Sequence, residues 1–115
     1  VIAERVIIAP WIADWVSYAA ELMPDVPRSL IYSFVPSNPL AYPVDNFNLN
    51  FKAFGLWNFV AQAQSRGQTV YGWTVNSDSD MREGFTKGIN GILTDYPAKC
   101  VALRPTNEGI YLSKN

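Results

Sequence analysis

Short runs of β-branched and aromatic residues alternate with longer amphipathic segments along this chain, and this alternation restricts its fold more than any other feature. The apolar runs begin roughly 20 residues apart, which leaves room for one helix between most of them. Strands connected through helices lie parallel and are joined by right-handed crossovers. The sequence therefore predicts an α/β protein built on a parallel sheet.

Five segments have the residue pattern of strands. QTVYGWTV, from Gln68 to Val75, is the clearest of them. NFNLNF, from Asn46 to Phe51, places its apolar side chains on one face and three asparagines on the other. Those asparagines line either a polar interior or a solvent-exposed face. The other expected strands are Arg5 to Ala9, Ser29 to Val35 and Asn90 to Thr94.

Four helices are expected between and after these strands. Apolar spacing predicts helices from Ile12 to Met23 and from Ala53 to Arg66, with Gly67 ending the second. A third follows the cap Asn76-Ser77-Asp78 and ends near Lys87. The aromatic residues on the first two helices are expected to lie in the core, namely Trp15, Phe54, Trp57 and Phe59.

The last helix is expected to begin at Asp95 as its N-cap, with Pro97 in its first turn, and to end at Pro105. Asp78 and Asp80 form an Asp-x-Asp pair that can attract Mg²⁺ or Ca²⁺. Acidic residues in the first turn of a helix also stabilise the helix dipole without any ligand, and we favour this interpretation.

Length and composition suit a single small domain. The chain has 115 residues, of which 49% are hydrophobic, and this apolar content excludes an intrinsically disordered protein. Its net charge of −1 favours neither a nucleic-acid partner nor an anionic membrane. No apolar run approaches the roughly 20 residues of a transmembrane helix, and no secretory signal pattern is recognised. The compartment stays unknown.

The chain has no histidine and a single cysteine, Cys100, so it can form neither an internal disulfide nor a Cys/His zinc site. Cys100 lies among apolar neighbours and is interpreted as a small core residue, with a reactive thiol as the alternative. The lack of imidazole removes the commonest general base in enzymes.

Two motifs resemble the carboxyl-terminal end of the glycerophosphodiester phosphodiesterase family. They are GQTVYGWTVN, from Gly67 to Asn76, and GINGILTDYP, from Gly88 to Pro97. The family usually has Val-Asp in place of Ile89-Asn90. Upstream, RVIIAPW from Arg5 to Trp11 resembles the family's fourth barrel strand, although that strand often ends in Ser-Phe.

This resemblance implies that the chain is the C-terminal portion, about strands 4–8, of a TIM-type (β/α)₈ barrel. Residues 1–105 would form the partial barrel domain and residues 106–115 a tail. The chain begins with Val1 rather than Met. A typical barrel would need about 130 further residues, so an amino-terminal half is expected to be missing.

The resemblance also implies chemistry whose main groups this chain lacks. The complete enzyme would hydrolyse glycerophosphodiesters to an alcohol and glycerol 3-phosphate. A divalent metal (Mg²⁺ or Ca²⁺) and a histidine acid/base pair from the first half of the barrel would act on the phosphoryl group. This chain alone is expected to be inactive, and no metal ligands are identified in it.

Three residues are candidates for substrate binding. The resemblance implies that Trp73 lines the part of the site that holds the glycerol or alcohol group. The carboxyl ends of the strands face the active site in such barrels. Trp11 stands at the end of the fourth strand and is either part of the site or a packing residue. Asn76 is either a helix cap or a substrate contact.

The expected partners are the missing half of the barrel, or another chain that covers the open sheet edges, together with a small glycerophosphodiester. A non-catalytic barrel fragment that acts as a structural or partner-binding subunit is the main alternative. A relative in the wider phospholipase-like superfamily, with a different phosphodiester substrate, is a further one.

Overall fold

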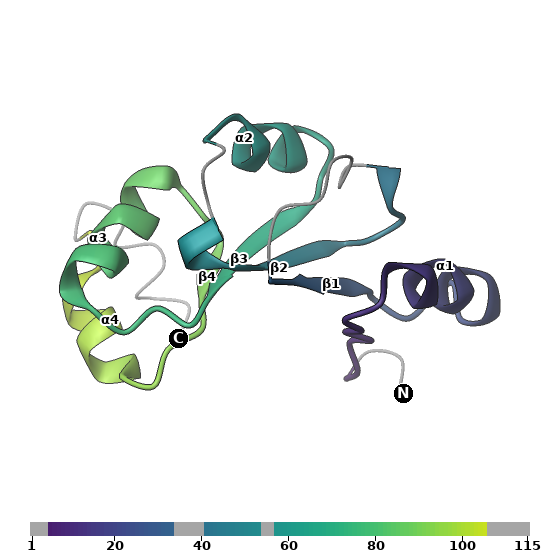
Figure 1. The fold of residues 1–115 in the computed structure, drawn as a ribbon, viewed down its shortest axis with the longest axis horizontal. Coiled ribbons are helices and arrows are strands. Elements are labelled where there is room, and N and C mark those ends of the chain that lie inside the picture. Colours follow the sequence, from purple (N-terminus) through teal and green to yellow (C-terminus); the bar gives the residue numbers. More distant parts are fainter. Residues whose placement is uncertain (1–4, 34–40, 54–56, 106–115) are drawn as a thin grey trace.

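The structure is a computed structural model, and it describes residues 5–33, 41–53 and 57–105. In this part of the chain, four parallel strands form one sheet in the order β1 (Ser29–Tyr32), β2 (Asn46–Asn50), β3 (Thr69–Trp73) and β4 (Gly91–Ile92). The helices are α1 (Ala13–Leu22), α2 (Trp57–Ser65), α3 (Asp78–Lys87) and α4 (Pro97–Leu103), and the short 3₁₀ helix η3 (Phe51–Ala53) follows β2. The predicted parallel α/β architecture is confirmed (Figure 1).

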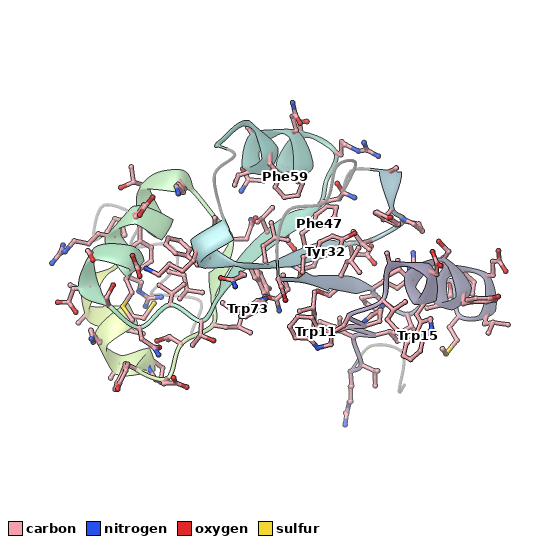
Figure 2. All side chains as sticks on the ribbon, viewed as in Figure 1. Trp11, Trp15, Tyr32, Phe47, Phe59 and Trp73 are labelled. Carbon is pink, nitrogen blue, oxygen red and sulfur yellow. The ribbon has the colours of Figure 1, made fainter. Side chains whose placement is uncertain are left out.

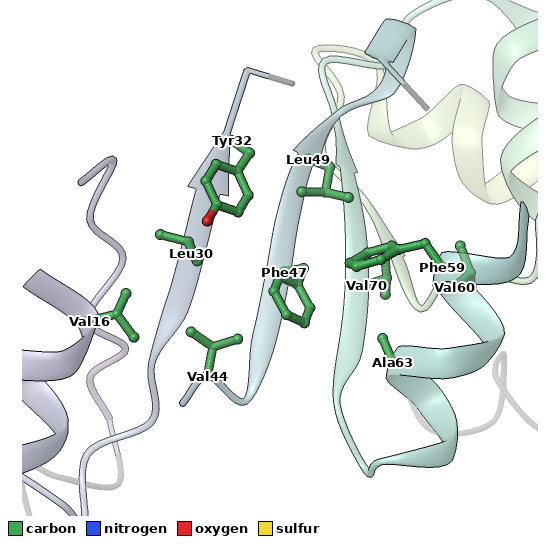
Figure 3. Packing of buried hydrophobic residues seen from close by; sticks show 10 residues of the cluster. All are labelled: Val16, Leu30, Tyr32, Val44, Phe47, Leu49, Phe59, Val60, Ala63 and Val70. Carbon is green, nitrogen blue, oxygen red and sulfur yellow. The ribbon is translucent and has the colours of Figure 1, made fainter. Parts of the chain in front are cut away.

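The alternation predicted for β2 gives the sheet two different faces. Phe47 and Leu49 point toward α2 and are buried, and the Phe47 ring meets the Phe59 ring edge-on at 5.1 Å between centroids. Each such buried side chain contributes roughly 1.5–3 kcal/mol of transfer free energy. The buried cluster around them (Figure 3) comprises Val16, Leu30, Tyr32, Val44, Phe47, Leu49, Phe59, Val60, Ala63 and Val70.

The opposite face of the sheet has a row of hydrogen bonds between polar side chains that crosses three strands. Ser29, Asn46 and Thr69 are register partners on β1, β2 and β3. The Ser29 hydroxyl donates to Asn46 Oδ1 at 2.6 Å, and Asn46 Nδ2 donates to Thr69 Oγ1 at 2.8 Å. These bonds form only when the three residues lie directly opposite one another on neighbouring strands. The row therefore favours this strand register over a shifted one.

The helix ends follow their local sequence signals in most places. Ser77 caps α3, since its Oγ accepts a hydrogen bond from the Asp80 backbone N–H at 3.1 Å. Gly88 ends α3 with a φ of 72°, a left-handed conformation that favours glycine. The expected cap of α4 is wrong, because Tyr96 rather than Asp95 precedes its first residue, Pro97. The Asp95 carboxylate bonds to another loop instead.

The strand predicted from Arg5 to Ala9 is also wrong as a buried strand. The structure gives this segment one parallel bridge, between Ile8 and Arg28, beside β1. Val6 and Ile7 are exposed. The segment nevertheless runs along the sheet edge, since the Ile31 backbone N–H donates to the Pro10 carbonyl at 3.1 Å. β-branched residues there indicate strand propensity, but the described part of the chain supplies nothing to cover them.

The core assignment of the helix aromatic residues is partly right. Phe59 is buried as predicted, whereas Trp15 on α1 is 59% exposed. Phe54 and the side chain of Trp57 lie outside the described residues, as does the tail from residue 106. The strand expected from Asn90 to Thr94 is shorter and only half-buried, as β4. No described helix is long and apolar enough to cross a membrane.

We predict that Asn46→Ala lowers the free energy of unfolding by about 1–3 kcal/mol, because it removes both side-chain bonds of the row. Asn48→Ala is the matched control, since the Asn48 Oδ1 atom is buried and has no hydrogen-bond partner among the described residues. Urea unfolding of both variants measures the difference. Equal losses for the two variants would contradict a register-setting role for the row.

Candidate functional site

The carboxyl ends of the strands meet along one edge of the sheet because the strands are parallel. Two of the predicted site residues lie at this edge: Trp73 is the last residue of β3, and Asn76 follows it in the loop to α3. Trp11 follows the segment that runs beside β1. All three predicted residues therefore belong to the same end of the sheet.

Trp11 and Trp73 are in contact although two strands separate their segments. Their ring centroids lie 5.4 Å apart and the ring planes are inclined by 75°. Three strand spacings across a flat sheet amount to roughly 14 Å, so the two long side chains lean toward one another across β1 and β2. Figure 2 shows both on the side of the sheet away from α2 and Phe59. We call this side, which also carries the hollow described below, the concave face.

The two indoles differ in how they are held. Trp73 is half-buried, and its Nε1–H donates to the Asn48 carbonyl at 3.0 Å. Since that bond occupies the only polar donor of the side chain, the ring faces are what Trp73 can offer to a ligand. Trp11 is 58% exposed, and we call the contacting pair of Trp11 and Trp73 the tryptophan corner.

Asn76 joins the loop after β3 to the loop after β4. Its Oδ1 accepts hydrogen bonds from the Asp95 backbone N–H at 2.9 Å and the Thr94 hydroxyl at 3.0 Å. Its Nδ2 donates to the Asp95 carboxylate at 2.8 Å. The side chain is therefore not the helix cap, a role that Ser77 has, and its polar atoms are engaged within the protein.

The acidic residues near this edge are paired with lysines. The Lys99 ammonium lies 3.2 Å from the Asp78 carboxylate and donates to the Asn76 carbonyl at 2.9 Å. Asp80 accepts a hydrogen bond from Lys52 at 2.6 Å, and this bond holds the pKa of Asp80 below its ordinary value. Neither lysine was recognisable from the sequence as a partner of these aspartates, because Lys52 and Lys99 lie in other segments of the chain.

The described residues do not make a metal centre. They contain no group of three or more His, Cys, Asp or Glu side chains that could hold a metal ion. Asp78 and Asp80, the pair with possible metal-binding spacing, each bind a lysine instead. Cys100 is half-buried beside Val75 and Met81, and burial raises the pKa of its thiol, which lowers its reactivity at neutral pH.

A hollow of about 420 Å³ lies on the concave face, nearer the amino ends of the strands. Asn46 and Asn48 line it, together with Thr69 and Tyr71 of β3. Ile7, before α1, and Leu93, after β4, lie at its two sides. Asn46 and Asn48 of β2 therefore line a hollow on this face of the sheet, whereas Asn50 is not among its lining residues.

Parallel strands alternating with helices, a hollow on the face away from α2 and loops gathered at the carboxyl edge define part of a TIM-type (β/α)₈ barrel. The family model described as "Glycerophosphoryl diester phosphodiesterase family" matches residues 3–99. The chain belongs to this family. The resemblance carried by the two sequence motifs is thereby confirmed.

Individual relatives agree with this assignment. A glycerophosphodiester phosphodiesterase of Bacillus altitudinis is 27% identical over 108 residues, which cover 90% of this chain and 44% of that protein. Human lysophospholipase D GDPD3 is 29% identical over 96 residues, which cover 72% of this chain and 30% of that one. This chain thus spans less than half the length of the curated relatives it matches.

Solved structures share the fold. A glycerophosphodiester phosphodiesterase from Parabacteroides distasonis gives a TM-score of 0.79 at 20% identity and covers 89% of this chain and 44% of that one. A phosphodiesterase from Oleispira antarctica, solved in complex with the product sn-glycerol-3-phosphate, gives 0.71 at 19% identity and covers 84% of this chain and 40% of that one.

We predict that Asn76→Asp destabilises the chain, because it replaces the donor to Asp95 with a second carboxylate. The loss should be about 1–3 kcal/mol at neutral pH. Urea unfolding at neutral pH measures this loss.

Asn90→Asp is the matched control for this variant. Asn90 Oδ1 accepts from the Val70 backbone N–H and from Gln64 Nε2, and an aspartate keeps that acceptor. The control should change stability by less than about 0.5 kcal/mol. An equal loss in the two variants would contradict the role of Asn76 in joining the loop after β3 to the loop after β4.

Proposed function

We propose that this chain is the carboxyl-side part of a phosphodiesterase that hydrolyses glycerophosphodiesters to an alcohol and glycerol 3-phosphate. Family membership supports the reaction class, and the tryptophan corner at the carboxyl edge is the observation that carries the placement of the substrate. Trp73 and Trp11 would contact the part of the substrate outside the phosphate. Asn76 would hold the loops around it in place.

The groups that act on the phosphate would come from outside this chain. The family is generally metal-dependent, and a metal would polarise the phosphoryl oxygens. The described residues do not fit a metal, since their candidate carboxylates bind Lys52 and Lys99. The chain also has no histidine to serve as the acid or base. We therefore assign it no proton-transfer step and no metal ligand.

The remainder of the barrel is the proposed partner. Trp15, Tyr18 and Leu22 recur at helical spacing on α1 and are 59%, 62% and 76% exposed. An apolar helix side with this exposure is typical of a surface that another element covers. The segment before α1 and β4 form the two edges of the described sheet. A helix and strands from the rest of the barrel would cover both.

The same exposed surfaces favour one alternative function, a non-catalytic subunit that binds a partner through α1 and the sheet edges. Such a protein would need the apolar side of α1 but not the tryptophan corner. The two hypotheses therefore differ in whether Trp73 matters for turnover once the barrel is complete.

The deciding experiment is a chimera in which this chain replaces the segment of the Bacillus altitudinis relative that it matches. With added Mg²⁺ or Ca²⁺, we expect the chimera to hydrolyse glycerophosphodiesters and the 115-residue chain alone to show no turnover. Trp73→Leu in the chimera should lower kcat/KM by roughly 10–100-fold, the equivalent of about 1.4–2.8 kcal/mol.

Ser17→Leu, an exposed position on α1, is the control and should leave kcat/KM unchanged. Turnover by the chain alone would overturn our placement of the chemistry. A folded but inactive chimera would favour the non-catalytic subunit.

A further inference from the structure

The hollow on the concave face has a wall on one side only. Each of its lining residues lies in a strand, in the segment beside β1, or within two residues of a strand, and no described helix contributes to it. Toward β4 it is closed by Tyr71, whose ring lies so near Gly91 that a Cβ there would come within 2.7 Å of it. Side chains that fill the hollow must therefore come from across the barrel.

One atom in this wall lacks a hydrogen-bond partner. Asn48 Oδ1 is buried, and no other lining residue has a buried side-chain N or O atom without a partner in the described part of the chain. The neighbouring row of Ser29, Asn46 and Thr69 is bonded within itself. Because buried acceptors in folded proteins nearly always have a partner, Asn48 Oδ1 marks a place where a donor is missing.

The charged residues of the hollow are already engaged near the amino ends of the strands. Arg28 donates from Nε to the Pro43 carbonyl at 2.9 Å and from Nη1 to the Val26 carbonyl at 3.0 Å. The Asp45 carboxylate accepts from the Arg28 backbone N–H at 2.8 Å. A cation placed against Asn48 would meet an uncharged amide, and burying a charge without a counter-ion is costly. The donor that Asn48 lacks is therefore neutral.

The size and position of the hollow indicate side chains rather than water or substrate. A water molecule occupies about 30 Å³, whereas the hollow has about 420 Å³. Substrates of (β/α)₈ barrels bind at the carboxyl ends of the strands, and the rest of the interior is filled by layers of side chains from alternate strands. This hollow lies toward the amino ends, where such layers are expected.

We propose that the hollow receives side chains from the missing strands of the barrel, and that a hydroxyl or amide group among them donates a hydrogen bond to Asn48 Oδ1. This inference rests on the proposed function in taking the rest of the barrel as the partner. It adds the chemistry of the contact, a Ser, Thr, Asn or Gln side chain opposite Asn48. The bond also reaches the site, because the Asn48 carbonyl holds the Trp73 Nε1–H at 3.0 Å.

The test compares Asn48→Leu, which keeps the approximate shape of asparagine without its acceptor, in the isolated 115-residue chain and in the chimera. Urea unfolding measures both. In the isolated chain the unfolding equilibrium constant should change less than about threefold, because no bond is lost. In the chimera it should rise about tenfold or more, because the donor is left unpaired. Ser17→Leu is the control and should change it less than about threefold in both.

A crystal structure of the unmodified chimera gives a second readout that does not depend on any variant folding. We expect a hydroxyl or amide donor from the amino-terminal half within about 3.2 Å of Asn48 Oδ1. Replacing that donor by an apolar residue in the Asn48→Leu chimera should restore most of the lost stability. Removing both partners of a buried bond costs far less than removing one.

Equal effects of Asn48→Leu in the chain and the chimera would overturn the proposal. A water or a charged side chain at Asn48 Oδ1, or a hollow left open in the folded chimera, would also overturn it. These results are separable from the outcome for the proposed function. An active chimera without the donor would remove only this contact. An inactive chimera in which the donor meets Asn48 would leave the contact standing without hydrolysis.

Discussion

Hydrogen bonds between the side chains of Ser29, Asn46 and Thr69 hold three parallel strands level with one another, and the rest of the site depends on that register. A slip of one residue would move the asparagines of β2 to the helix-covered face and Phe47 to the concave one. It would also turn Trp73 away from Trp11. The polar row thus links the buried core on one face to the position of the aromatic corner on the other.

Features with a local cause were predictable from the sequence. The alternation in β2 predicted which side chains are buried, because successive side chains of a strand point to opposite faces. The bounds of α3 followed from Ser77 and Gly88, whose capping geometry depends only on their immediate neighbours. The motifs around Trp73 and Asp95 were recognisable for a similar reason, since each is a continuous stretch.

Features that depend on distant segments were not predictable. Asn76 was expected to cap a helix or touch substrate, yet its bonds go to Thr94 and Asp95 in the next loop. Trp15 has the helical spacing of a core residue, but helical spacing cannot say whether a partner element is present to bury it. The contact between Trp11 and Trp73 joins the first segment to the end of β3 across two other strands, which no single stretch of sequence specifies.

The central claim is that Trp11, after the first segment, and Trp73, at the end of β3, meet on one face of the sheet. The most direct measurement is a nuclear Overhauser experiment between the indole protons of Trp11 and Trp73 in the isolated chain. Ring centroids 5.4 Å apart predict strong cross-peaks between the two rings. Well-resolved indole signals with no cross-peaks between them would contradict this contact, and with it the shared site at the carboxyl edge.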